Sequence, residues 1–193
     1  YFYKASLDEK KSNLVICFYS GRDICVETFY NEIVDQFKSL IFAKHILFIT
    51  PNFNKKNIVK KLLNFETQNI LKDRINSLQE LNFHTCFISK KGNFDLQTFN
   101  QEQAFFNTKE VENILELGLV DIIERRNLVI NSHANIHFVK PSGKHTNKFI
   151  DVRNILESSA EISFIATNLL KLLPKEISQI YIDTSGMYPL AFE

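Results

Sequence analysis

Three short and almost wholly apolar segments recur in the first half of the chain, at residues 14–19, 46–50 and 85–89. Segments of this length, rich in β-branched and aromatic residues, are typical of strands that are buried on both faces. Each is followed by residues such as Gly, Pro and Asn, which favour turns. We therefore predict three strands of one parallel sheet.

Longer segments with helical periodicity separate these strands. Residues 26–43 and 56–81 both repeat apolar side chains at intervals of three and four positions. An alternation of strands and helices predicts a parallel sheet with right-handed crossovers. The predicted fold class is thus α/β, with a three-stranded parallel unit at the N-terminus. Residues 94–107 are polar and lack a clear period, and we interpret them as a connection that completes a first domain over 1–107.

The second half of the chain carries further periodic segments. Thr108 is a suitable N-cap for a helix with acidic residues in its first turn. We expect this helix to end near Leu117, because Gly118 stands where a helix often terminates. A second helix is expected over residues 158–173, and a strand over 179–182.

The composition excludes several classes of protein. The chain has 193 residues, of which 45% are hydrophobic and 23% charged, and its formal net charge is +1. This balance does not indicate a nucleic-acid partner, and the apolar runs are too short to span a membrane. Its three Cys residues have no metal-ligand spacing, so we expect reduced thiols, no protein metal site and a cytoplasmic location. The chain opens with Tyr1, and we expect the natural N-terminus to lie upstream.

One loop between two strand-like segments combines small, polar and basic residues. It runs Pro-Ser-Gly-Lys-His-Thr over residues 141–146, between Phe138 and a predicted strand at 149–152. Such a loop can be a plain turn, or it can hold an anion. In the second case the Ser142 hydroxyl and nearby N–H groups would donate to the anion, and Lys144 would supply a mobile positive charge.

A second loop has a similar character. Asp183, Thr184, Ser185 and Gly186 follow the predicted strand at 179–182 and precede a helix start. In α/β proteins, phosphate binds where a parallel strand ends beside the N-terminus of a helix. A structural turn would produce the same pattern, so this loop too has two interpretations.

The stretch "HFVKPSGKHTNKFIDVRNIL" resembles the N-terminal hood of orotate phosphoribosyltransferases. In that family an aromatic-led strand runs into Ser-Gly, and a second strand reads aromatic-Ile-Asp-x-Arg. "VENILELGLVD" is similar to the opening helix of the family, and "IYIDTSGMYPLAFE" to its first core strand and pyrophosphate loop. The matching hood positions are Phe138, Ser142, Gly143, Phe149, Ile150, Asp151 and Arg153.

The resemblance covers the N-terminal half of a type I phosphoribosyltransferase domain, which we expect to begin at residue 108 and to be incomplete at 193. The chain departs from the family at Pro141, where a basic residue is usual. It also lacks the acidic pair and Thr/Gly loop that bind phosphoribosyl pyrophosphate in the family. The resemblance therefore leaves the catalytic residues unassigned.

The resemblance implies transfer of a phosphoribosyl group from phosphoribosyl pyrophosphate to a nitrogenous base, with Mg²⁺ as the cofactor and a homodimer as the assembly. Lys144 would pair with an anionic group of the substrate and Phe149 would pack near the base. Asp183, with Thr184, Ser185 and Gly186, would cradle pyrophosphate. The alternative is a non-catalytic module that senses a nucleotide or phosphoribosyl pyrophosphate in a multi-gene system, such as bacterial defence.

Overall fold

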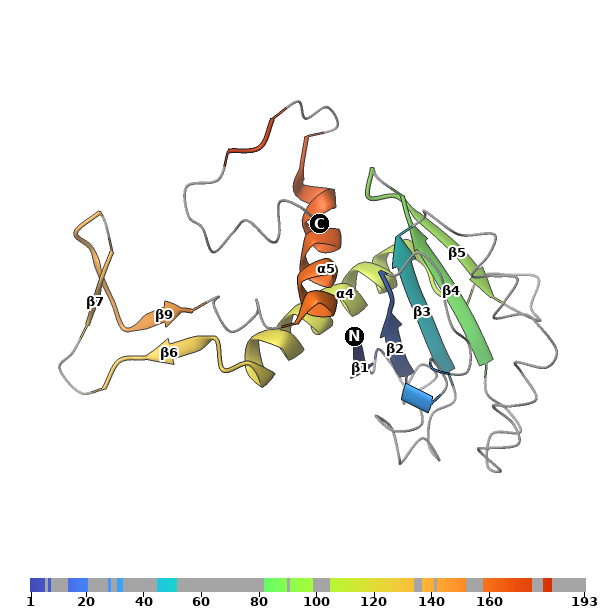
Figure 1. Cartoon of the computed structure of the whole chain (residues 1–193), viewed down its shortest axis with the longest axis horizontal. Helices are drawn as coiled ribbons and strands as arrows, with labels where there is room; N and C mark the ends of the chain where they lie inside the picture. Colours follow the sequence, from blue (N-terminus) through green and yellow to red (C-terminus); the bar gives the residue numbers. More distant parts are fainter. Residues whose placement is uncertain are drawn as a thin grey trace.

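The computed structural model describes residues 1–5, 7, 14–20, 28, 31–32, 45–51, 82–89, 91–98, 105–133, 137–140, 142–151, 158–174 and 179–181. They form two regions, a five-stranded sheet packed against two helices and a long arm that leads away from them (Figure 1). The arm comprises residues 129–150 and joins the two helices along the chain.

The five strands follow one another across the sheet in their sequence order. The three central strands are parallel, and the two edge strands are antiparallel to their neighbours. The prediction of an α/β fold with three neighbouring parallel strands is therefore confirmed. From edge to edge the strands are β1 (Phe2–Ala5), β2 (Leu14–Phe18), β3 (His45–Pro51), β4 (Asn82–Ile88) and β5 (Phe94–Thr98).

The central strands are buried on both faces, as their uninterrupted apolar sequences predict. Every residue of β2 and β3 is buried, and so are the last five residues of β4. The predicted crossover helices at 26–43 and 56–81 lie outside the described residues, except for helical positions at 28, 31 and 32.

Both edge strands were missed by sequence reasoning. The interpretation of residues 94–107 as a connection is wrong for its first part, because Phe94–Thr98 pairs with β4. Its apolar residues Phe94 and Leu96 alternate with polar ones and pack against the core, which is the pattern of a half-buried edge strand.

The helix α4 (Thr108–Arg125) begins and ends differently from the prediction. Its N-cap is Asn107 rather than Thr108, because the Asn107 side chain accepts from the N–H of Glu110 while the Glu110 carboxylate accepts from the N–H of Asn107. The predicted end near Leu117 is also wrong. Gly118 lies inside the helix, where a Cβ would come within 2.6 Å of the Phe164 ring and 2.7 Å of the Tyr3 ring. This glycine serves close packing rather than termination.

The helix α5 (Ser159–Leu169) continues into a short 3-10 turn, η3 (Leu170–Leu172), and agrees closely with the predicted helix over 158–173. Ser158 caps it by accepting from the N–H of Glu161. The strand predicted over 179–182 is wrong for the described residues 179–181. They belong to no strand, and Tyr181 is 90% exposed.

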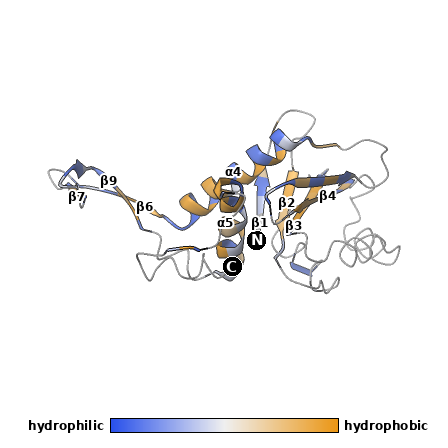
Figure 2. Ribbon diagram, turned by 90° about the horizontal axis from the view of Figure 1, so that it is seen from above, coloured by the Kyte–Doolittle hydropathy of each residue, from blue (hydrophilic) through white to orange (hydrophobic). Residues whose placement is uncertain are grey.

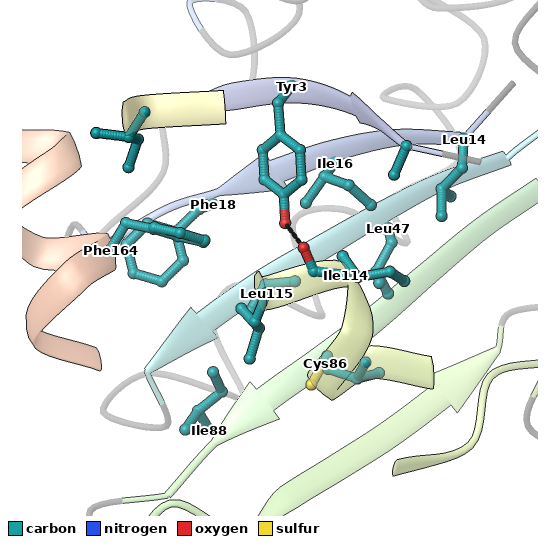
Figure 3. Packing of buried hydrophobic residues seen from close by; sticks show 14 of the residues in the cluster. Tyr3, Leu14, Ile16, Phe18, Leu47, Cys86, Ile88, Ile114, Leu115 and Phe164 are labelled. Carbon is teal, nitrogen blue, oxygen red and sulfur yellow. Dashed lines mark hydrogen bonds between the residues drawn. The ribbon is translucent and has the colours of Figure 1, made fainter. Parts of the chain in front are cut away.

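One hydrophobic core joins the sheet to both helices. Phe164 of α5 is fully buried, with its ring centroid 5.1 Å from Phe18 and 4.9 Å from Tyr1. The Tyr3 hydroxyl donates to the Ile114 carbonyl of α4 over 2.7 Å (Figure 3). The domain boundary expected between residues 107 and 108 therefore does not coincide with a break in the core.

Candidate functional site

The arm holds those predicted ligand-binding residues that the structure describes, which are Ser142, Lys144 and Phe149. It comprises β6 (Val129–Asn131), β7 (Phe138–Val139), β8 (His145–Thr146) and β9 (Lys148–Ile150). β6 pairs with β9 near the body, and β7 pairs with β8 farther out, both antiparallel. Figure 2 shows the arm extending from the end of α4.

The strands expected around Phe138 and Phe149 are both present, but they do not pair with each other. Phe138 pairs with Thr146, which the sequence placed in the loop, and Phe149 pairs with Ile130. Their rings still meet, with centroids 5.6 Å apart. The loop is therefore shorter than predicted, because its second half forms β8.

The turn at the tip accounts for Gly143 without a ligand. The Gly143 N–H donates to the Lys140 carbonyl, the Lys140 N–H donates to the Lys144 carbonyl, and Gly143 has a φ of +75°. The hairpin between β4 and β5 repeats this arrangement, with Gly92 at the same φ. A left-handed residue in such a turn favours glycine for backbone reasons alone.

The predicted binding residues of the arm are displayed to solvent. Ser142 and Lys144 are exposed in the turn, and Phe149 is 48% exposed. Their contact with an anion or a base stays a prediction. The other predicted site residues, Asp183, Thr184, Ser185 and Gly186, lie outside the described residues.

The charge of the arm is uneven. Residues 129–151 contain three Lys and three His but a single acidic residue, Asp151. Lys140, Lys144 and Lys148 are exposed. Cations carried on one projecting segment attract anionic ligands even when the whole chain is nearly neutral.

A buried carboxylate fixes the base of the arm. Glu161 of α5 is 2% exposed and accepts from Arg125 over 2.7 Å and from Arg126 over 2.9 Å and 3.2 Å. The Arg125 and Arg126 side chains remain 48% and 28% exposed while they pair with this buried carboxylate. Arg125 is the last residue of α4 and Arg126 is its C-cap, so these contacts tie the end of α4, two residues before the arm, to α5.

The sheet contains a second cluster that sequence reasoning missed. His45 Nδ1 and His84 Nε2 are 3.1 Å apart, both side chains are buried, and the Phe105 ring stacks on both imidazoles at 4.4 Å and 4.8 Å. A hydrogen bond between two imidazole nitrogens needs one N–H and one lone pair. The sequence pattern that could have indicated this pair is the position of both His residues near the start of neighbouring parallel strands, two register positions apart.

Burial disfavours the thiolate form of both described Cys side chains. Cys17 and Cys86 are buried, and burial raises both thiol pKa values, that of Cys86 to about 12. Among the described residues, no group of three or more His, Cys, Asp or Glu side chains is arranged to hold a metal ion.

Comparison with known proteins gives no relative from which a function could be transferred, because no family model, curated protein or solved structure matches the chain. No helix in the described ranges is long and apolar enough to cross a membrane.

Proposed function

We propose that the protein binds a phosphoribosyl ligand, phosphoribosyl pyrophosphate or a nucleotide, beside the arm, and that it transfers the phosphoribosyl group to a nitrogenous base. The observation that carries the proposal is the order α4, arm, α5. It is the order of opening helix, hood and following helix in the family that the sequence resembles.

The side chains of the arm suit such a ligand. Lys144 is an exposed point charge on the turn, where it can reach a phosphate or carboxylate without being desolvated in the free protein. Phe149 presents half of its surface to solvent and is supported by Phe138, so its ring can pack on a planar base.

In the proposed reaction a nitrogen of the base attacks the anomeric carbon of the ribose, and the bond from that carbon to pyrophosphate breaks. Catalysis would come from positioning the reactants and stabilising the charge on the leaving pyrophosphate. Mg²⁺, which the resemblance implies, would be held mainly by the phosphates of the ligand, since no group of three or more His, Cys, Asp or Glu side chains among the described residues is arranged to hold a metal ion. The proposed role of this chain in binding therefore rests on the side chains of the arm.

The test is calorimetry of the complete protein with phosphoribosyl pyrophosphate. We expect Lys144→Ala to weaken binding by about 1–3 kcal/mol, the scale of a lost hydrogen bond to a charged group. Lys91→Ala is the matched control, because Lys91 is an exposed residue of the β4–β5 turn, which has the same backbone hydrogen bonds. Equal affinities in the wild type and Lys144→Ala would leave residues 140–144 as a plain turn.

A second candidate function is non-catalytic sensing. It is favoured by the packing of α4 and α5, which flank the arm and also share the core of the five-stranded sheet. A ligand that moved the arm would therefore act on elements that reach the N-terminal half. Measuring the pyrophosphate released from phosphoribosyl pyrophosphate in the presence of bases separates the two candidates. An enzyme releases pyrophosphate, whereas a sensor binds the ligand without cleaving it.

A further inference from the structure

The backbone hydrogen bonds of the arm identify which groups of β6 point outward. The Asp151 N–H donates to the Leu128 carbonyl, and the Ser132 N–H donates to the Asn147 carbonyl, each over 2.8 Å. Along an antiparallel strand, residues alternate between those that bond the neighbouring strand and those that face away from it. The backbone groups of Leu128, Ile130 and Ser132 therefore point toward β9. Those of Val129 and Asn131 point to the opposite, outer edge.

This outer edge is open and uncharged. In the described ranges β6 pairs with β9 alone, and its three residues, Val129, Ile130 and Asn131, carry no charge. The outer edge of β9 differs, because it carries the exposed Lys148. A lysine on an edge strand discourages pairing with another chain, and β6 has no such protection.

Each face of the ribbon formed by β6 and β9 carries an exposed apolar pair. Val129 and Ile150 share one face and are 38% and 58% exposed, while Ile130 and Phe149 share the other and are 40% and 48% exposed. A two-stranded ribbon is only marginally stable in water, and more strands with an apolar face are needed for a stable sheet. Among the described residues, the ribbon thus has both an edge that pairs with no other strand and apolar surface that further strands would cover.

We propose that the β6 strands of two copies of this chain pair edge to edge, giving a four-stranded sheet in the order β9-β6-β6-β9 about a two-fold axis. Antiparallel pairing that sets Val129 of one copy opposite Asn131 of the other joins their outward N–H and C=O groups in two hydrogen bonds. The two-fold axis repeats this pair. It also sets the two Ile130 side chains opposite each other, a favourable cross-strand contact.

A second copy suits this edge better than a charged partner does. β6 offers no charge to attract an acidic or basic surface, and its pattern of outward groups is complementary to itself. Pairing at β6 brings no like charges together along the strand, because Lys148 lies on β9 and Lys140 and Lys144 lie in the turn. The proposal does not depend on the phosphoribosyl ligand.

The test is sedimentation of the full chain over a range of concentrations, with two variants that act differently. Asn131→Pro removes an outward N–H and leaves the β6–β9 hydrogen bonds intact. Ile130→Lys sets two ammonium groups against each other at the axis. We expect a concentration-dependent dimer for the wild type, and at least a tenfold rise in the dissociation constant for each variant.

The matched control is Val139→Lys, which makes the same kind of change at a 64% exposed position on β7, away from the β6 edge. It should dimerise like the wild type. Circular dichroism and melting temperature establish that each variant is folded. A wild type that is monomeric at every concentration would overturn the proposal, as would a dimer that survives both variants. Equal loss in Val139→Lys and Ile130→Lys would overturn the assignment to β6.

Discussion

Phenylalanine is placed differently in the two regions of the molecule, which are the sheet with its two helices and the arm. Phe164 is fully buried between α5 and the sheet, where its ring meets those of Tyr1, Tyr3 and Phe18. Phe149 on the arm is 48% exposed, and its ring contacts that of Phe138 at a tilted angle of 35°. Apolar surface removed from water stabilises the fold, whereas apolar surface left in water is available to a partner. Phe164 therefore contributes to stability, whereas Phe149 leaves apolar surface exposed on the arm.

The two regions also share one turn. The hairpin of the sheet at residues 89–93 and that of the arm at 140–144 have matching backbone hydrogen bonds and a glycine at a φ of +75°. Glycine therefore does not mark a ligand site in either region. What distinguishes the arm is its projection from the body and the side chains around its turn.

Truncating one phenylalanine in each region gives the largest contrast. Phe164→Ala should lower the free energy of unfolding by about 3–5 kcal/mol, since it empties a fully buried aromatic site. Phe149→Ala should change it by less than about 0.5 kcal/mol, as at other surface positions. Urea denaturation followed by circular dichroism measures both values. Similar losses for the two variants would contradict the division between a stabilising core and a displayed arm.

Adding a methyl group to a glycine in each region should give a smaller effect. In an isolated helix Gly→Ala is stabilising by about 1 kcal/mol, but at Gly118 the Cβ would collide with the buried Tyr3 and Phe164 rings. Overpacking a core costs about 1–3 kcal/mol, so after the helix gain is subtracted we expect a net loss of up to about 2 kcal/mol.

At Gly143 a Cβ meets no atom within 4 Å, so the cost of Gly143→Ala arises from the positive φ alone. Hydrogen exchange should show faster opening confined to the arm, with global stability unchanged. A more stable Gly118→Ala variant would mean that the helix and the rings separate more easily than the packing indicates.

The smallest effect is expected from removing one hydroxyl. Tyr3→Phe loses the bond to the Ile114 carbonyl and should cost about 0.5–1.5 kcal/mol. Thr146→Val on the arm, where the hydroxyl bonds the Lys148 carbonyl at the surface, should cost less. Denaturation of the two variants at neutral pH measures the difference.

The Tyr3 substitution should also change the response to alkali. Burial, and secondarily the charge of Asp121, raises the pKa of Tyr3 well above its ordinary value. In the folded protein the Tyr3 hydroxyl therefore keeps its proton at a pH at which an unfolded tyrosine has lost it. The stabilisation by the Tyr3 hydroxyl is complete below about pH 10 and falls as the pH rises above that value. The difference in unfolding free energy between wild type and Tyr3→Phe should shrink as the pH rises past that point. A constant difference would indicate that Tyr3 ionises equally in both states.

Local signals predicted the sheet better than they predicted contacts between distant segments. The parallel arrangement of β2, β3 and β4 was predicted from the length of the apolar segments and the alternation of strands and helices. Both features can be recognised within short stretches of sequence. The end of α4 was misjudged because the role of Gly118 depends on Tyr3 and Phe164, which are far away along the chain. The Arg125–Glu161 contact and the His45–His84 pair were missed for the same reason.

For the candidate site too, local sequence predicted the turn but not the pairing of its strands. Exposure of Ser142 and Lys144 followed from the turn-forming residues around them. The pairing of β9 with β6 could not be anticipated, because β6 is three residues long and its sequence lacks the length that marks a strand. The part of the site at residues 183–186 stays a prediction.

The contact between Arg126 and Glu161 closes a loop that contains the arm. The two residues are 35 positions apart, one before the arm and one after it. Once the two ends of a loop are held together, lengthening it adds little to the cost of closure, only about 0.6 kcal/mol for each doubling of its length. The arm can therefore gain or lose residues during evolution while the core beneath it keeps its packing. Because this contact holds the two ends together, the length of the arm can change without the fold having to be stabilised anew.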